Sequence, residues 1–184
     1  MKDFSGKIIP SIVDYSQFCD ALNSDCERVN IMVGNINNLK EMILELHKKA
    51  KKAFVHIEMI SGIGRDKDAV RFMCEQFDID GIITTKSQII LAAKAQKVPC
   101  VQRIFAIDSA ALKNAFSAVA SCLPDEVELM PGLMPKIIRE TKEAIKRPLI
   151  VGGLLKTAEE AKEAFLSGAD YVSTGCKELW NIKI

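Results

Sequence analysis

The fold is decided by residues 149–175, which read LIVGGLLKTAEEAKEAFLSGADYVSTG. A short apolar run at residues 149–152 is followed by Thr157-Ala-Glu-Glu160, a capping box that opens a helix. Gly168 suits the end of that helix, and a second apolar run follows at residues 171–174. Strand, helix and strand in this order indicate two parallel strands joined by a right-handed crossover.

The same alternation extends through the chain in both directions. Short, mostly apolar runs are typical of strands that are covered on both faces. They lie at residues 7–13, 29–33, 53–59, 81–85, 99–105, 127–130, 149–152 and 171–174. Amphipathic runs with capping residues predict helices at residues 17–22, 37–49, 66–77, 87–96, 109–120, 135–145, from 157 to 168, and at 177–180.

Eight such units predict an α/β fold, a compact (β/α)8 TIM-like barrel of parallel strands that occupies residues 1–184 as a single domain. Barrels of this type usually have about 250 residues, so 184 residues require short loops and helices. A doubly wound open sheet is the alternative.

The composition fits a globular protein rather than a disordered one. Hydrophobic residues make up 48% of the chain, and the formal net charge of +1 leaves a nucleic-acid partner open. No apolar run is long enough for a membrane span or placed as in a signal peptide. The six cysteines show no C-x-x-C spacing and no zinc pattern, so we expect free thiols, a reducing compartment and a cytoplasmic location.

Two glycine turns stand at the ends of the last two predicted strands. Gly152 and Gly153 end the seventh strand, and Thr174 and Gly175 end the eighth. Loops at these positions of a barrel often bind phosphate, because glycine lets an anion approach backbone N–H donors. A helix starting at Lys177 would add a favourable dipole. We therefore predict a phosphate site; the alternative is that these glycines only make tight turns.

Charged residues interrupt the apolar strands, where burial without a partner is costly. We predict that Glu58, Lys86, Arg103 and Glu128 line the mouth of the barrel, the cations facing phosphate and the carboxylates facing ligand hydroxyl groups. His56 and Glu58 should share one side of the third strand. A structural network of ion pairs inside the barrel is the alternative, with His56 as a core histidine.

Seven segments occur together in the order and spacing of a known family. They are Ile8-Ile-Pro-Ser-Ile12, His56-Ile-Glu-Met-Ile-Ser-Gly-Ile63, Gly81-Ile-Ile-Thr-Thr-Lys-Ser87, Val101-Gln-Arg-Ile-Phe-Ala-Ile-Asp-Ser109, Glu128-Leu-Met-Pro-Gly132, Gly152-Gly-Leu-Leu-Lys-Thr157 and Val172-Ser-Thr-Gly-Cys-Lys-Glu-Leu-Trp180. With them the chain resembles the glycerol-3-phosphate-responsive antiterminator family, the regulators of glycerol uptake operons.

The resemblance implies a barrel that binds glycerol 3-phosphate and acts on leader mRNA, so that transcription passes a terminator. It implies no cofactor beyond this effector ligand and no membrane partner, and it leaves a homo-oligomer open. Two positions depart from the family pattern. Lys86 stands where Arg is common, and Gly175-Cys176 stands where Ser-Asn is usual.

The RNA-binding face has a weak signal, because only 6% of the residues are aromatic. Arg139, Lys142 and Lys146 share one sector of the predicted helix at 135–145, and we predict that they contact RNA. A second basic cluster, Lys48, Lys49, Lys51 and Lys52, lies at the end of the helix at 37–49. Each cluster also fits a solvated helix end, where cations favour the helix dipole.

An enzyme acting on a small sugar or triose phosphate is the alternative function. Glu58, Glu128, Asp108 and Lys86 stand at strand ends, where acid–base chemistry takes place in such barrels. The sequence shows no nucleophile–base pair and no metal cluster, so we predict a regulator and not an enzyme. A barrel kept only as an assembly scaffold is a third alternative.

Overall fold

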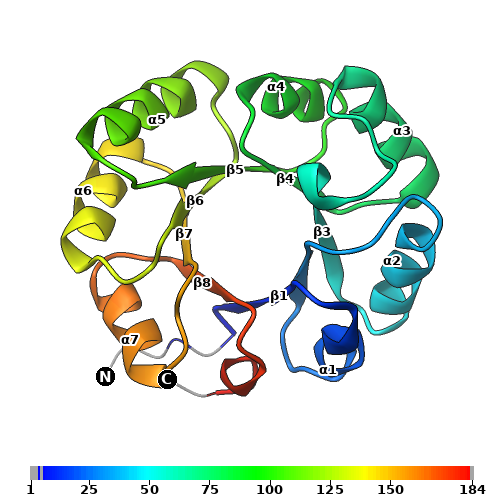
Figure 1. Ribbon diagram of the computed structural model, residues 1–184, viewed down its shortest axis with the longest axis horizontal. Coiled ribbons are helices and arrows are strands. Elements are labelled where there is room, and N and C mark those ends of the chain that lie inside the picture. Colours follow the sequence, from blue (N-terminus) through cyan, green and yellow to red (C-terminus); the bar gives the residue numbers. More distant parts are fainter. Residues whose placement is uncertain (1–3, 5, 183–184) are drawn as a thin grey trace.

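The protein is a closed barrel of eight parallel strands that pair in chain order, and β8 pairs with β1 (Figure 1). The structure, a computed structural model, describes residues 4 and 6–182. This architecture confirms the predicted TIM-like barrel, and the open sheet is wrong. The strands are β1 (Ile8–Ile12), β2 (Arg28–Ile31), β3 (Lys52–His56), β4 (Gly81–Thr84), β5 (Cys100–Phe105), β6 (Glu126–Met130), β7 (Leu149–Gly152) and β8 (Tyr171–Thr174).

The α-helices form an outer ring around the sheet (Figure 1). They are α1 (Phe18–Leu22), α2 (Leu39–Lys48), α3 (Lys67–Phe77), α4 (Ser87–Ala95), α5 (Ser109–Cys122), α6 (Pro135–Ile145) and α7 (Ala158–Leu166). Short 3-10 helices add η1 (Tyr15–Gln17), η2 (Ile57–Met59) and η3 (Lys177–Leu179). None of the helices in the described ranges is both long and apolar enough to cross a membrane.

Several predicted element ends are confirmed, and others are wrong by a few residues. The capping box of Thr157 and Glu160 is present at the start of α7. Ser87 and Ser109 do not cap their helices, because the N-caps lie one residue earlier. Asp108 caps α5 by accepting from the Ala111 N–H, whereas Lys86 precedes α4 without a side-chain cap.

Two further corrections concern the mouth of the barrel. The third strand ends at His56, so Glu58 does not share a strand face with it but lies in the turn η2. The helix at Lys177 is a three-residue 3-10 helix, and one such turn contributes little dipole to an anion site.

The apolar core has two parts. The larger cluster lies between the sheet and the helices. The smaller cluster comprises Ile9, Phe54, Ile83, Val101 and Ile150, which come from five different strands and meet inside the barrel. The Phe54 ring fills the space beside β4, because a Cβ on Gly81 would lie 2.2 Å from it. The barrel is therefore packed with side chains at this level.

Three aspartates stand directly before even-numbered strands and fix the neighbouring odd-numbered strands. Each carboxylate accepts a backbone N–H at 2.7–2.9 Å from the start of the preceding strand: Asp80 from Ala53, Asp125 from Cys100, and Asp170 from Leu149. These bonds hold the N-terminal ends of β3, β5 and β7. They leave the C-terminal ends, where the βα loops meet, for binding.

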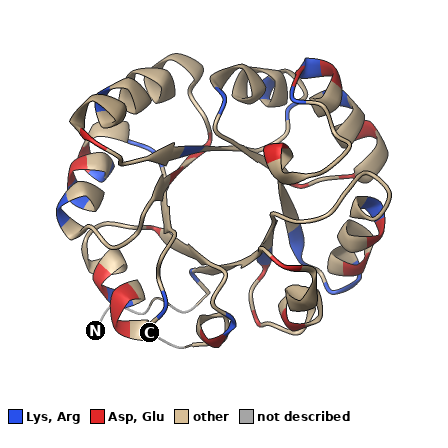
Figure 2. Cartoon of the chain, in the orientation of Figure 1, with Lys and Arg blue, Asp and Glu red and all other residues tan. Residues whose placement is uncertain are grey.

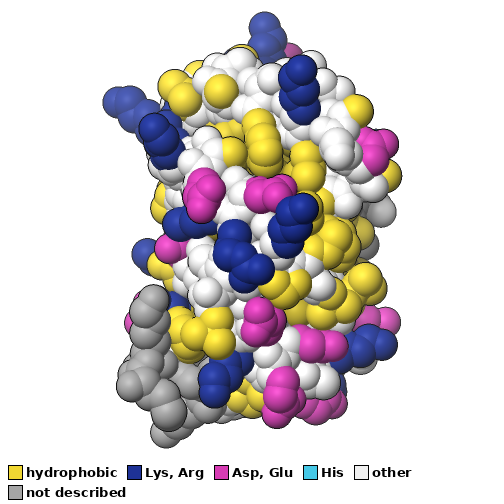
Figure 3. Space-filling model, turned by 90° about the vertical axis from the view of Figure 1, so that its left-hand side faces the viewer, with side chains coloured by type: hydrophobic (Ala, Val, Ile, Leu, Met, Phe, Trp, Pro, Cys, Tyr) yellow, Lys and Arg dark blue, Asp and Glu magenta, His cyan; other side chains and the backbone are white. Residues whose placement is uncertain are grey.

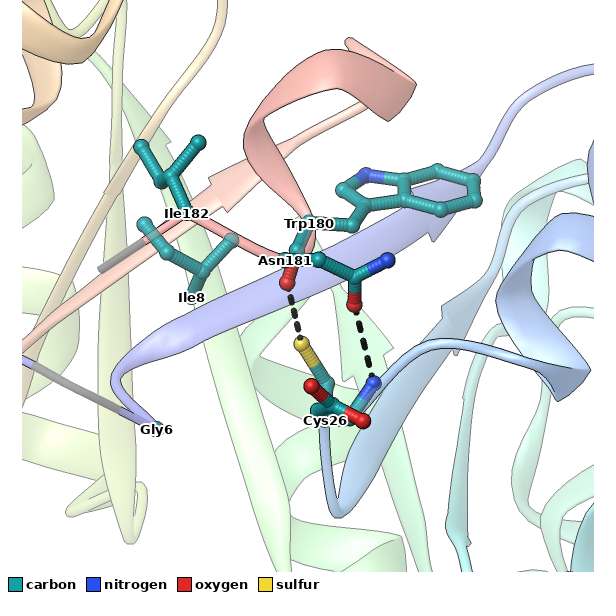
Figure 4. A pocket seen from close by; sticks show the side chains of 7 residues that line it. Gly6, Ile8, Cys26, Trp180, Asn181 and Ile182 are labelled. Carbon is teal, nitrogen blue, oxygen red and sulfur yellow. Dashed lines mark hydrogen bonds between the residues drawn. The ribbon is translucent and has the colours of Figure 1, made fainter.

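Residues 180–182 pack beside the start of β2 (Figure 4). The Cys26 thiol donates to the Trp180 carbonyl at 3.0 Å, and the Asp25 N–H donates to Asn181 Oδ1 at 2.9 Å. A pocket of about 110 Å³ lies between these segments. These bonds tie the last described segment to the barrel wall.

All six cysteines are free, and Cys26, Cys100 and Cys122 are buried. Burial raises the pKa of the Cys100 thiol to about 12, so this thiol stays protonated and inert.

Candidate functional site

The two glycine turns that the sequence singled out lie side by side at the mouth of the barrel. Together the β7–α7 loop and the segment after β8 line an open pocket of about 420 Å³. The lining residues are Gly153, Leu154, Leu155, Lys156, Thr174, Gly175 and Cys176. The predicted placement of the two turns is therefore correct, and phosphate binding by them stays a prediction.

Thr174 ties the two turns together. Its buried hydroxyl donates to the Leu155 carbonyl at 3.0 Å and accepts the Cys176 N–H at 3.0 Å. The indole Nε1 of Trp180 donates to the Thr174 carbonyl at 2.9 Å. The Thr174 side chain is thus engaged with protein groups, and it positions the pocket rather than projecting into it.

The β7–α7 turn presents backbone donors. Gly153 and Leu154 have φ angles of 78° and 65°, and this left-handed conformation is costly for Leu154. Among the residues that the structure describes, no acceptor bonds to the N–H groups of Leu154, Leu155 or Gly175, whereas the Gly153 N–H faces β8 through the pairing of Gly152 with Ser173. Free amides beside the Lys156 side chain suit an anion.

Gly152 serves a different purpose from its neighbour. It is buried at the end of β7, and a Cβ there would lie 2.1 Å from the Ser173 hydroxyl. The residue must be glycine because β8 packs closely against it. We therefore assign Gly152 to packing beneath the pocket.

Below the mouth, Arg103 and Glu128 form a buried ion pair inside the barrel. The register places the two residues opposite each other on β5 and β6, with Arg103 Nε 2.7 Å from Glu128 Oε2. Glu128 has no exposed surface, and its Oε1 accepts from the Ser173 hydroxyl at 2.6 Å. The ion-pair network of the alternative interpretation therefore exists here, and Ser173 connects it to Gly152.

Glu58 and Lys86 lie near each other on another side of the mouth, joined through Thr84. The Thr84 hydroxyl donates to Glu58 Oε1, and the Lys86 N–H donates to Thr84 Oγ1 at 3.1 Å. His56 Nδ1 lies 3.1 Å from Glu58 Oε2. No hydrogen bond between described residues joins this group to Arg103 and Glu128.

The surroundings of Glu58 keep its carboxylate ionised. Burial alone would raise the pKa of Glu58, but the contacts with His56 and Thr84 outweigh it and lower the pKa below the ordinary value. The Lys86 side chain is half-buried, and no described residue pairs with its ammonium group. A neighbouring anion and cation at the mouth can accept from a hydroxyl and attract a phosphate, respectively.

The predicted RNA sector of α6 is only partly available. Lys142 forms an ion pair with Asp170, the aspartate that fixes β7. Arg139 Nη1 donates to the Ser167 hydroxyl at 3.2 Å, and Lys146 is exposed at the end of the helix. Basic and acidic residues occur together on the outer helices (Figure 2), and the face that carries α6 mixes charged with apolar side chains (Figure 3).

The second basic cluster is also divided by the fold. Lys51 is buried, and its ammonium group donates to the carbonyls of Ser24 and Cys26 at 2.5 and 2.6 Å. Lys52 belongs to β3. Lys48, Lys49 and Lys52 are exposed, and Lys48 forms an ion pair with Glu45 at 2.5 Å.

The residues considered for the alternative function lie in different places: Glu58 and Lys86 at the mouth, and Glu128 in its buried ion pair. Asp108 caps α5, so its carboxylate is used by the backbone. Among the described residues, no three His, Cys, Asp or Glu side chains lie close enough to hold a metal ion.

Sequence reasoning missed Ser173 and Met32, which complete the surroundings of the buried pair. Arg103 Nη2 points at Met32 Sδ at 3.6 Å. Serine and methionine are ordinary residues in buried strands, so composition gave no signal for them. The strand register, which sequence does not supply, is what brings them to Arg103 and Glu128.

Comparison with known proteins gives a consistent result. Residues 8–180 match the family model described as Glycerol-3-phosphate responsive antiterminator. Uncharacterized protein YgcP from Escherichia coli strain K12 is 31% identical over 175 residues, which cover 95% of this chain and 92% of that protein.

Solved structures agree with this match. The glycerol uptake operon antiterminator regulatory protein from Listeria monocytogenes is 30% identical with a TM-score of 0.92, over 96% of this chain and 95% of that one. An antiterminator-related protein from Thermotoga maritima is 31% identical with a TM-score of 0.83, over 94% and 96%. A deoxyribose phosphate aldolase from Aeropyrum pernix, 11% identical with a TM-score of 0.74 over 96% and 88%, shares the fold alone.

Proposed function

This chain belongs to the glycerol-3-phosphate responsive antiterminator family, and on that premise we propose that it senses glycerol 3-phosphate and binds the leader mRNA of glycerol-utilisation operons. The observation that carries the proposal is the match over residues 8–180, supported by the antiterminator from Listeria monocytogenes. A regulator of this kind works where transcripts are made, so we place it in the cytoplasm. It needs no cofactor besides its effector.

In this proposal the effector lies at the mouth of the barrel with its phosphate on the two glycine turns. Its phosphate would accept from the free N–H groups of Leu154 and Gly175 beside the Gly153 turn, with Lys156 supplying positive charge there and Lys86 adding positive charge from the other side of the mouth. Its hydroxyl groups would then reach toward Arg103, Glu128 and Glu58.

Ligand sensing is tested by thermal unfolding with glycerol 3-phosphate, inorganic phosphate and glycerol. A ligand that binds only the folded state raises Tm in proportion to its affinity. We expect the largest shift with glycerol 3-phosphate, a smaller shift with phosphate, and none with glycerol. No shift with any phosphate compound would contradict the site.

RNA binding is tested with leader RNA in the presence and absence of glycerol 3-phosphate. An effector changes RNA affinity only if it binds the two conformational states differently. We expect tighter RNA binding with the effector present, and a shuffled RNA of the same length as control. Equal affinity under both conditions would contradict a ligand-dependent regulator.

The same samples separate a regulator from an enzyme. Incubation with glycerol 3-phosphate and small sugar phosphates, followed by mass spectrometry, detects turnover. A regulator leaves each compound unchanged, whereas turnover that is lost on replacing Glu58 or Glu128 would favour the enzyme.

A further inference from the structure

Arg103 is a buried cation whose donors are not matched by good acceptors. Its side chain is 7% exposed, and its Nε bonds to Glu128. Both oxygens of Glu128 are occupied, by Arg103 and by Ser173. Among the described residues, the only group facing another guanidinium nitrogen is the thioether of Met32. A thioether is a weak acceptor, so the guanidinium retains unused hydrogen-bonding capacity.

The Met32 side chain covers Arg103 and can move away from it while the backbone stays in place. It follows β2, and its N–H donates to the Ile12 carbonyl at 3.0 Å, which holds the backbone in line with the strand. Its side chain is unbranched with three rotatable bonds. The side chain can therefore change rotamer without displacing the barrel wall.

We propose that Met32 determines ligand selectivity at this site. Its thioether covers Arg103 in the absence of ligand, and the right ligand displaces it. An oxygen of the polyol part of a short polyol phosphate replaces the thioether on Arg103, while the phosphate stays on the β7–α7 and β8 turns. Inorganic phosphate binds the turns and leaves Met32 in place. The inference rests on the proposed function, because it assumes that the ligand enters at these turns.

A movement of Met32 can also be transmitted to the loops at the mouth of the barrel. The loop after β2 pairs with the loop after β3, since the Ile36 N–H donates to the Ser61 carbonyl at 2.9 Å and the Ser61 N–H donates to the Gly34 carbonyl at 3.0 Å. A shift at Met32 is therefore shared by two neighbouring loops at the mouth. These loops distinguish the polyol-loaded state from the phosphate-loaded state.

The test compares Kd values for glycerol 3-phosphate and inorganic phosphate by calorimetry in the full chain. Met32→Ala removes the thioether that covers Arg103. The Kd for glycerol 3-phosphate should therefore fall by roughly three- to tenfold, because the ligand no longer has to displace this one weak contact. The affinity for inorganic phosphate should not change. Met73→Ala, which truncates a buried methionine of α3 in the outer core, is the matched control and should alter neither Kd.

A second measurement uses the unmodified chain and so does not depend on the folding of a variant. In a protein with ¹³C-labelled methionine methyl groups, the Met32 signal, assigned with Met32→Leu, should shift with glycerol 3-phosphate and not with inorganic phosphate. A Met32 signal that ignores a bound glycerol 3-phosphate, or an equal change in both Kd values in Met32→Ala, would overturn the inference alone. Failure of both ligands to bind the unmodified chain would overturn the proposed function together with it.

Discussion

The Thr174 hydroxyl joins the β7–α7 loop to the segment after β8. Its removal should lower both the stability of the protein and its affinity for the effector. Thr174→Val keeps the shape of the side chain but leaves the Leu155 carbonyl and the Cys176 N–H without their partner. We expect the free energy of unfolding to fall by about 1–3 kcal/mol. Binding of glycerol 3-phosphate should also weaken, because the turns lose their relative position.

Thr141→Val is the matched control in urea unfolding and calorimetry. The Thr141 hydroxyl is buried on α6 without a hydrogen-bond partner among the described residues. Replacing it with a methyl group should leave stability unchanged or raise it. Equal losses in the two variants would show that the Thr174 bonds contribute nothing beyond packing.

Glu58 should make the stability of the protein sensitive to acid. Its pKa is lower in the folded protein than in the unfolded chain, so the folded state binds fewer protons in the acid range. The stabilisation is complete above the ordinary pKa of 4.5 and is lost as the pH falls through the lower folded value. Glu58→Gln should flatten this part of the profile of unfolding free energy against pH, whereas an unchanged slope would contradict the assignment.

Residue identity alone predicted the charged members of the site but not their pairing. Arg103 and Glu128 were noticeable because charge is rare within apolar strands. That they pair with each other depends on the register of β5 and β6, which the sequence pattern does not contain. Glu58 was assigned to a strand because an apolar run does not show where the strand gives way to a 3-10 turn.

At the level of strands and helices, the aspartates that precede β4, β6 and β8 stabilise the barrel by accepting hydrogen bonds from the backbone of the neighbouring strands. Asp170→Ala leaves the Leu149 N–H without its carboxylate acceptor and leaves the Lys142 ammonium group only the Arg147 carbonyl, at 3.4 Å, among the described residues. We expect a loss of about 1–3 kcal/mol in the free energy of unfolding. Denaturant unfolding of Asp170→Ala measures it directly.

Asp68→Ala is the control for this prediction, because Asp68 pairs only with Arg71 on the exposed surface of α3. Exposed pairs one helical turn apart contribute about 0.3–0.5 kcal/mol. A loss for Asp170→Ala no larger than that of Asp68→Ala would show that the strand N–H bond is replaced by water at no cost.

Element order was predictable because alternation of apolar runs and capped helices is a local property of the chain. The ends of helices were harder to predict where two neighbouring residues can both serve as the N-cap. Asp108 and Ser109 each suit an N-cap, and the aspartate holds the position. At Lys86 no side chain caps the helix, so a capping signal at Ser87 was misleading.

At the scale of the whole molecule, the barrel places every βα loop at one end, which is why glycine turns far from Glu58 in sequence share a mouth with it. The overall charge is near neutral, and the outer helices carry both signs (Figure 2). An RNA-binding face was therefore hard to predict from composition. The fold leaves fewer basic residues of the α6 sector available for RNA, because Lys142 forms an ion pair with Asp170.

If the predicted sector of α6 contacts the phosphates of leader RNA, the contacts come from Arg139 and Lys146, because Lys142 pairs with Asp170, and the binding should depend on salt. Each phosphate contact that is lost should lower the slope of log affinity against log salt concentration by about 0.7–1. Charge reversal of both residues should thus weaken binding most at low salt, and Tm should fall only slightly, because Arg139 loses one hydrogen bond to Ser167. Lys142→Glu is unsuitable for this purpose, since it would break the ion pair with Asp170 and destabilise β7.

Charge reversal of Lys48 and Lys49 at the end of α2 gives the comparison for the same change in net charge. A larger effect at α6 than at α2 would locate the RNA on α6, because a general loss of positive charge acts on both pairs alike. An RNA affinity that does not vary with salt in the unmodified protein would exclude phosphate contacts by either helix. The RNA would then have to be recognised elsewhere on the surface.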